Sequence, residues 1–209
     1  MLLALSFPRY GHPAVAFIAL VPLFVALSGW NGRSGAVPGV STRRGFMLGL
    51  LAGFIHYAGT VYWTGATVST FGGLPVMVAA LVAGLLALYM AAYVATFGAI
   101  TAILVRRFHV LGLWIAPCVW VTMEYLRGIL IGGFPWIPLG NTMVTFLPIA
   151  QLASVAGVYG LSVFVALLNV GFTITAVSEG RRRVTAMGST IALLAAVSIW
   201  AACACRQTR

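Results

Sequence analysis

The sequence predicts an all-α fold, a polytopic bundle of membrane-spanning helices, and three observations support this. Of the 209 residues, 62% are hydrophobic and only 7% are charged, whereas soluble domains carry about 25% charged residues. The apolar residues form long runs, close to the roughly 20 residues that a helix needs to cross a bilayer. The short alternating segments that are typical of a membrane β-barrel are missing from the sequence.

Six apolar runs are long enough for complete transmembrane helices, and together they predict one membrane domain over residues 1–209. They cover residues 13–30, 46–64, 74–104, 111–131, 149–177 and 184–203. The third and fifth are longer than a simple crossing, so we expect them to tilt or to extend into the interface. Residues 1–8 are apolar but too short to cross, and they lack the features of a signal peptide. We interpret them as the second half of a partial N-terminal span.

The net charge of +10 comes from twelve basic residues, all of them arginine. Eight lie in three connections on one side of the predicted bundle: Arg33, Arg43, Arg44, Arg106, Arg107, Arg181, Arg182 and Arg183. The other side holds Arg9, Arg127, Arg206 and Arg209. The positive-inside rule therefore predicts that the eight are cytoplasmic and that the C-terminus lies outside. The charge indicates membrane topology, and we expect no nucleic-acid partner because no folded basic face is present.

One irregular stretch interrupts the predicted outer side, "EYLRGILIGGFPWIPLGN" at residues 124–141. Irregular backbone near a membrane is tolerated where it is buried in protein or lines a wet cavity, so this side is favoured for a site. Glu124 and Arg127 are three residues apart and share a helix face. A lone charge at mid-bilayer costs about 2.5–3.5 kcal/mol. Two interpretations stay open: a structural pair that fixes the helix end, or a contact for a lipid headgroup or charged substrate.

Polar residues also recur at helical spacing in two of the predicted spans. In the fifth span one face holds Tyr159, Ser162, Ala166, Asn169 and Thr173. In the second span one stripe holds Gly45, Gly49, Gly53, His56 and Thr60, beginning with small residues four apart. His56 is therefore expected to face neighbouring helices, as an interior histidine rather than a proton relay.

Other catalytic patterns are missing from the sequence. It contains no phosphate-binding loop, no Ser-His-acid order and no metal-ligand cluster. Cys203 and Cys205 are two residues apart, on nearly opposite faces of a helix, which disfavours a shared metal. We therefore expect no cofactor, no metal and no catalytic residue in this chain.

Four collinear blocks carry a resemblance to a known family. They are "LSFPRYGHPAVAFIALVPLFVAL" near the start, "YWTGATVSTFGGLP" at 62–75, residues 124–141, and "LPIAQLASVAGVYGLSVFVALLNV" at 147–170. They resemble the apolipoprotein N-acyltransferases, whose pattern runs E-W-L-R, G-F-P-W and L-G, then P-L-A-Q, G-V-Y-G-L-S-F and V-N. The order of the blocks is preserved over nearly the whole chain.

The resemblance implies a bacterial inner-membrane protein of lipoprotein maturation. Members of the family move an acyl chain from phosphatidylethanolamine to the amino group of a diacylglyceryl-modified cysteine on an apolipoprotein. A periplasmic nitrilase-like domain supplies their Glu–Lys–Cys triad, because thioester formation needs an activated nucleophile and a stabilised oxyanion. This sequence has no lysine and stops at Arg209, where that domain would begin. We therefore expect the N-terminal membrane half, with a separate nitrilase-like chain as a possible partner.

The same resemblance implies a lipid-binding or site-shaping set of residues near the outer surface. Glu124 and Arg127 would shape or contact the entrance, and Phe134, Pro135 and Trp136 would form a stiff aromatic lip. The full set is Glu124, Arg127, Gly133, Phe134, Pro135, Trp136, Tyr159, Ser162 and Asn169. The "GFPW" loop would lie on the periplasmic side. Two alternatives remain, a noncatalytic lipid-binding scaffold and, from the polar stripes alone, a small transporter.

Overall fold

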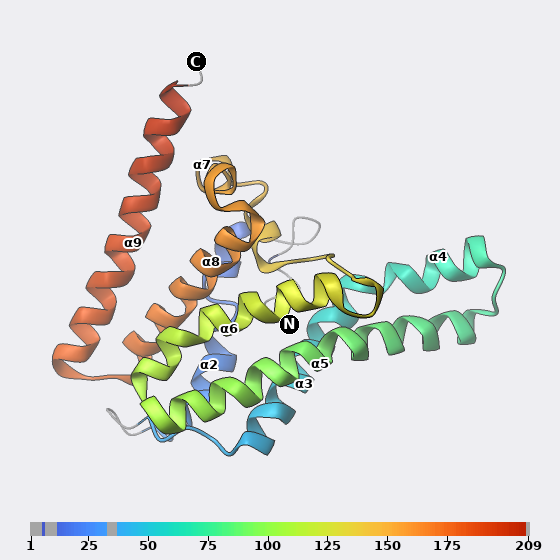
Figure 1. Ribbon diagram of the computed structural model, residues 1–209, viewed down its shortest axis with the longest axis horizontal. Helices are drawn as coiled ribbons and strands as arrows, with labels where there is room; N and C mark the ends of the chain where they lie inside the picture. Colours follow the sequence, from blue (N-terminus) through green and yellow to red (C-terminus); the bar gives the residue numbers. More distant parts are fainter. Residues whose placement is uncertain (1–5, 7–11, 33–36, 208–209) are drawn as a thin grey trace.

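The computed structural model describes residue 6, residues 12–32 and residues 37–207, the last seven of them as backbone only. All regular elements within this part are helices, which confirms the predicted all-α class (Figure 1). They are η1 (Pro13–Phe17), α2 (Val21–Ser28), α3 (Thr42–Val61), α4 (Trp63–Gly72), α5 (Val76–Phe108), α6 (Val110–Ile129), η2 (Leu130–Gly132), η3 (Leu139–Met143), α7 (Leu147–Ala150), α8 (Ala153–Val177) and α9 (Gly180–Gln207).

The expectation of six complete spans is wrong for the described residues. Four helices are long and apolar enough to cross a membrane: Val76–Phe108, Val110–Gly132, Ala153–Val177 and Gly180–Trp200. A fifth span results if α3 and α4, which meet at a bend of 47°, are counted as one. The region predicted as a span at 13–30 forms only a shorter apolar stretch, Pro13–Ser28, made of η1 and α2 with a break between them. The partial span expected at residues 1–8 falls almost wholly outside the described residues.

A side chain from α8 explains why the region 13–30 is not one continuous helix. In an α-helix the N–H of Leu20 would donate to the carbonyl of Ala16. Here the Leu20 N–H donates to Oδ1 of Asn169 (2.8 Å), and Nδ2 of Asn169 donates to the Ala16 carbonyl (2.8 Å). Pro22 adds to the break because it has no N–H to donate. Hydropathy could not predict this, since Asn169 lies 149 positions further along the chain.

Helices α3 and α5 pack very closely, along the glycine stripe that the sequence predicted. Gly45, Gly49 and Gly53 are all buried on α3. A Cβ on Gly45 would collide with the backbone of Gly98 on α5, and the other two face α5 in the same way. Small residues at such positions let two membrane helices approach. His56, the next member of the stripe after Gly53, is also buried, as expected of an interior histidine.

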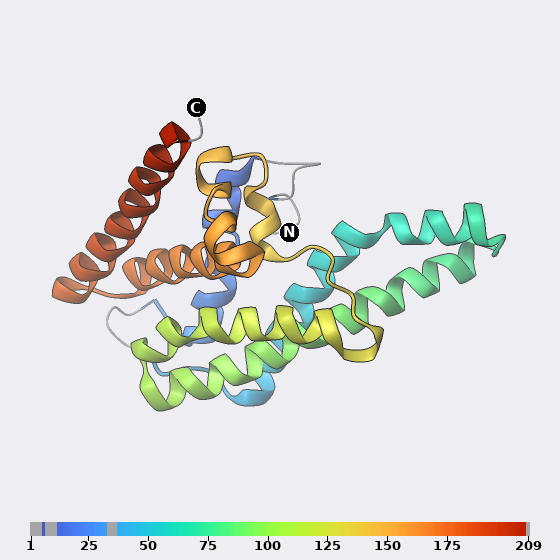
Figure 2. The ribbon, with the colours of Figure 1, turned by 45° about the horizontal axis from the view of Figure 1, so that its top comes forward.

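The helices spread out from this pair. Helix α9 lies along one side against α8, while α4 and the first half of α5 project as a hairpin on the other side (Figures 1 and 2). Large apolar side chains on the hairpin are exposed, such as Phe71 and Met77. Exposed apolar surface on this scale indicates contact with lipid or with another protein.

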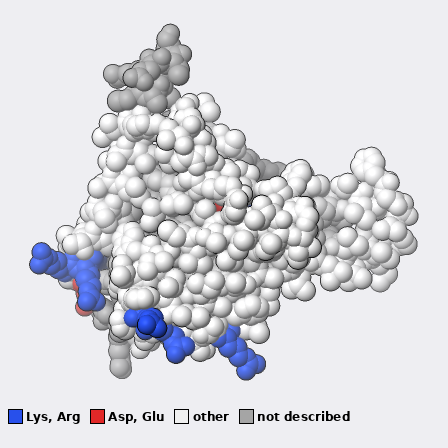
Figure 3. Space-filling view, in the orientation of Figure 1, with Lys and Arg blue, Asp and Glu red and all other residues white. Residues whose placement is uncertain are grey.

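The exposed arginines gather at one end of the bundle (Figure 3). Arg43 and Arg44 lie in the first turn of α3, Arg106 and Arg107 in the last turn of α5, and Arg181 to Arg183 in the first turn of α9. The last three therefore begin a helix instead of lying in a loop between spans. Arg182 lines a cavity with Val110, which brings the start of α9 next to the start of α6. The irregular backbone after α6 lies at the opposite end (Figure 1).

Candidate functional site

The candidate site is built on an extended stretch between η2 and η3, which we call the connecting segment (residues 133–138). The backbone is strained just before the segment and near its end, because Ile131 in η2 (φ 52°) and Ile137 (φ 60°) are non-glycine residues with positive φ. Such residues cost on the order of 1–3 kcal/mol each and persist only where the surroundings hold them. Gly133 (φ 66°) makes the turn into the segment without that cost.

Arg127 provides much of that hold. Its Nη2 donates to the carbonyl of Trp136 (3.0 Å) and, at a longer distance, to that of Ile137 (3.5 Å). Its Nη1 donates to the hydroxyl of Tyr57 on α3, and the guanidinium lies 5.2 Å from the centre of the Tyr57 ring. The Arg127 carbonyl accepts from the N–H of Phe134 (2.9 Å). One buried side chain therefore ties the connecting segment to both α6 and α3.

Glu124 holds the far end of the same segment. Its Oε1 accepts from the indole N–H of Trp120 (2.9 Å) and from the backbone N–H of Leu139 (2.6 Å). The next N–H, that of Gly140, donates to the Ser162 hydroxyl on α8 (2.9 Å). The chain leaving the connecting segment is thus fixed between α6 and α8.

The structure does not bring Glu124 and Arg127 together as a hydrogen-bonded pair. Within the described ranges their hydrogen bonds go to the groups named above, while Oε2 of Glu124 and Nε of Arg127 are buried without a partner. Both residues border a small cavity of about 10 Å³ with Tyr57 and Trp120. Both side chains are almost wholly buried, since Glu124 is 6% and Arg127 is 2% exposed. The geometry therefore fits a role in shaping the segment.

The two aromatic residues of the segment differ in exposure: Trp136 faces outward, whereas Phe134 is partly buried against the core. Trp136 is 55% exposed, and its ring lies 5.9 Å from that of Trp63 on α4 and 6.0 Å from that of Phe134. Pro135 between them is also exposed. Tryptophan favours the membrane–water interface because its ring is apolar and its N–H is polar. This arrangement fits the expected lip.

The three predicted site residues of α8 are in two different places. Tyr159 packs edge-on against Tyr125 of α6 (5.9 Å), and Ser162 accepts from Gly140 as described. Both thus lie beside the segment. Gly140 itself has no room for a side chain, because a Cβ there would meet the Val158 carbonyl. Asn169 lies two turns further along α8 and bridges the break at Ala16 and Leu20 instead.

Sequence reasoning did not find Tyr57 and Trp120, which complete the buried polar cluster. Trp120 could have been found, because it precedes Glu124 by four residues and therefore shares its helix face. Tyr57 gives no such signal, because its partner Arg127 is 70 positions away. Nowhere in the described residues do three His, Cys, Asp or Glu side chains come together as a metal site requires.

Long apolar helices, arginines gathered at one end and a strained aromatic segment at the other define a multi-pass helical membrane protein. Comparison with known proteins gives the family. The sequence profile of the apolipoprotein N-acyltransferase N-terminal domain matches residues 1–171. The chain belongs to the apolipoprotein N-acyltransferase family, as the four motif blocks predicted.

Three bacterial relatives illustrate the extent of the match. The apolipoprotein N-acyltransferase of Geobacter metallireducens is 42% identical over 173 residues, which is 81% of this chain and 30% of that protein. Those of Haemophilus ducreyi and Nitrosomonas europaea are 31% and 33% identical over 75% and 77% of this chain, and again 30% of each relative is covered. The chain thus spans about 30% of the length of the relatives it matches.

Proposed function

We propose that this chain is the membrane part of an apolipoprotein N-acyltransferase and binds the lipid substrates of acyl transfer. The substrates would be phosphatidylethanolamine, as acyl donor, and the diacylated N-terminal cysteine of an apolipoprotein, as acceptor. The observation that carries the proposal is the connecting segment, because the buried side chains of Glu124 and Arg127 hold strained backbone so that Pro135 and Trp136 face outward. Strained backbone and buried ionisable residues both lower stability, and their combination is typical of a functional site.

The chemistry of transfer requires groups that these 209 residues do not contain. A Glu–Lys–Cys triad needs a lysine, and the sequence has none. Acyl transfer therefore depends on a nitrilase-like domain, whether it belongs to the same polypeptide or to a separate chain. In this proposal the membrane part orients the two lipids, and holding reactants in place can lower a barrier substantially without any chemical group.

The proposal includes an orientation in a bacterial inner membrane. The arginine-bearing end faces the cytoplasm, because seven exposed arginines lie there and positive residues are retained on that side. The connecting segment and the end of α9 then face the periplasm, where the acceptor lipoprotein is found.

A domain exchange tests the proposal. Residues 1–171 of this chain replace the matching part of the Geobacter metallireducens relative, and lipopeptide acylation is measured by mass spectrometry in membranes of a strain depleted of its own enzyme. The matched control carries the corresponding part of the Haemophilus ducreyi relative. We expect triacylated product from both chimeras. If the Haemophilus ducreyi control is active and the chimera of this chain inserts stably but is inactive, the noncatalytic scaffold is favoured instead.

A further inference from the structure

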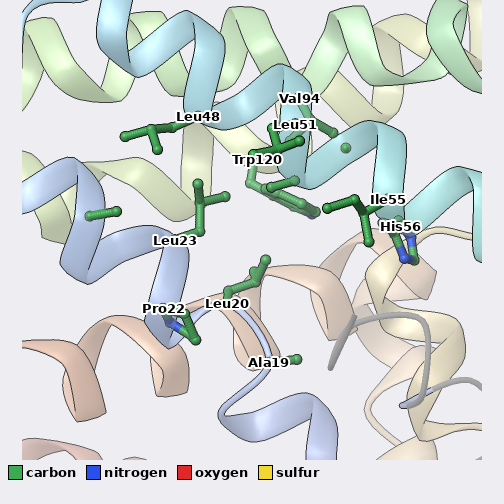
Figure 4. Close-up of a pocket in the computed structure, with 13 residues that line it drawn as sticks. Ala19, Leu20, Pro22, Leu23, Leu48, Leu51, Ile55, His56, Val94 and Trp120 are labelled. Atoms are coloured by element: carbon green, nitrogen blue, oxygen red, sulfur yellow. The ribbon is translucent and has the colours of Figure 1, made fainter.

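A second cavity lies on the other side of the buried polar cluster, between α2, α3 and α6 (Figure 4). We call it the α2–α3 groove. Its volume is about 340 Å³, within the range of small-molecule sites. Its walls are mainly aliphatic, with Leu20 and Leu23 from α2, Leu48, Leu51 and Ile55 from α3, and Trp120 from α6. The connecting segment contributes no residue to it, so it is distinct from the site described above.

In the proposed membrane orientation the groove opens toward the hydrocarbon of the bilayer. Leu51 and Ile55 form its rim and are 60% and 43% exposed, although they lie in the middle of the long apolar helix α3. At that depth the surrounding solvent is lipid chain, and an apolar cavity does not hold ordered water. Any occupant that enters through this rim therefore comes from the bilayer.

The two ends of the groove differ in polarity. Leu48 marks one end, and His56, whose ring nitrogens are drawn at the other end in Figure 4, lies eight residues further along α3, about 12 Å at the helical rise. The His56 end of the groove adjoins the buried polar cluster. There the Trp120 indole donates to Glu124, and the Tyr57 hydroxyl, next to His56 in sequence, accepts from Arg127. Such a gradient over 12 Å suits an amphiphile with one polar end.

The wall formed by α2 is held by a dedicated contact. Asn169 replaces the helical hydrogen bond between Ala16 and Leu20, and this break sets the position from which Leu20 lines the groove. A continuous helix through residues 13–28 would place Leu20 differently. Asn169 is therefore a positioning residue for the groove.

We propose that the α2–α3 groove binds one acyl chain of a membrane phospholipid, with the glycerol-linked end toward His56 and the terminal methyl toward Leu48. The proposal that the groove binds an acyl chain rests on the residues that line it in this chain. Only the identity of the lipid as phosphatidylethanolamine rests on the proposed function. A lipid seated there would have its polar end directed toward the cluster that holds the connecting segment, so the two sites would share one lipid-filled region of the bundle.

Photo-crosslinking of the full chain in nanodiscs tests the groove. The probes are phosphatidylethanolamine and phosphatidylglycerol, each with a diazirine either near the ester or near the chain end. We expect near-ester probes to label peptides containing Ala19, Ile55 and His56, and chain-end probes to label those containing Ala26 and Leu48. Labelling of the groove by both lipids would support the acyl-chain site. It would count only against the assignment of phosphatidylethanolamine as the bound lipid.

A filling substitution separates specific occupancy from general lipid contact. Ala52→Leu places three extra carbons in the groove, and inserting methylenes into an occupied site costs about 1–3 kcal/mol, so labelling should fall about fivefold or more. The matched control is Ala92→Leu, at an exposed position of α5 outside the groove. Ala26→Leu provides a second filling variant if Ala52→Leu lowers the thermal midpoint. Equal labelling of filled and control variants, or crosslinks from the groove to a second copy or to another part of this chain, would overturn the proposal.

Discussion

The carboxylate of Glu124 offers a direct test of how the connecting segment is held. Replacing it with leucine leaves two buried donors, the Trp120 indole N–H and the Leu139 N–H, without an acceptor. Each unsatisfied donor costs about 1–3 kcal/mol. Replacing it with glutamine removes the same charge but keeps one acceptor oxygen for both donors. The charge is absent from both variants, so the difference between them reports the acceptor oxygen, reduced by the cost of burying the glutamine amide group.

We expect Glu124→Leu to be less stable than Glu124→Gln by at least about 2 kcal/mol, the lower bound for two stranded donors. For a chain of this size that is a difference of roughly 4–8 °C in thermal midpoint. The assay is thermal unfolding in detergent, with hydrogen exchange at the Leu139 amide as a local readout. Protection at Leu139 should be lost in the leucine variant and retained in the glutamine variant.

Exposed Glu179 supplies the control, since Glu179→Leu should change stability by no more than about 0.5 kcal/mol. If Glu124→Gln proves as damaging as Glu124→Leu, the negative charge and not the acceptor oxygen is what the fold requires. If neither variant changes the exchange of Leu139, the reasoning about the segment is refuted.

Three further predictions follow from single contacts. Gly140→Ala should destabilise the fold by about 1–3 kcal/mol, because the added Cβ would meet the Val158 carbonyl. Gly188→Ala has open space around the added Cβ and should be neutral or stabilising. The thermal midpoints of the two variants test this. Asn169→Leu should lower the free energy of unfolding by about 2–4 kcal/mol, because it leaves the Leu20 N–H and the Ala16 carbonyl without partners. The control Asn141→Leu, at an exposed position, should have little effect. Unchanged amide exchange at Leu20 would count against the bridge. With all three native cysteines replaced by serine, Arg182→Cys should resist a membrane-impermeant maleimide added outside cells, and exposed Thr145→Cys should react; the reverse pattern would invert the orientation.

Composition and periodicity predicted the parts of this fold that depend on neighbours in sequence. The all-α class, the long third span, and the close approach at Gly45, Gly49 and Gly53 all follow from hydropathy and from residues four apart. The number of spans did not follow, because the break at Leu20 is made by Asn169 from α8 and the bend at Tyr62 separates α3 from α4. Hydropathy and the residues nearby in sequence predict neither the break nor the bend.

The candidate site shows the same division. The sequence singled out Glu124 and Arg127 because charges are rare in an apolar chain, and it left open whether they pair or contact a headgroup. Their actual partners are backbone groups of Trp136, Ile137 and Leu139 and the side chains of Tyr57 and Trp120. A helix-face argument considers residues on one helix, so it cannot predict bonds to a strained segment that folds back beside that helix.

The central claim is that the connecting segment presents a binding surface for lipid substrate, and competition crosslinking measures it most directly. A diacylated lipopeptide with a photoreactive peptide part is bound to the chain in nanodiscs, with unlabelled lipopeptide as competitor. We predict competable labelling of peptides containing residues 133–138, reduced about tenfold or more by Phe134→Ala with Trp136→Ala, since aromatic anchors of a binding site cost about 2 kcal/mol or more when truncated. Phe71→Ala, at an exposed position on the projecting hairpin, should leave it unchanged. Labelling that no competitor reduces, or that falls equally in the Phe71 variant, would contradict the account.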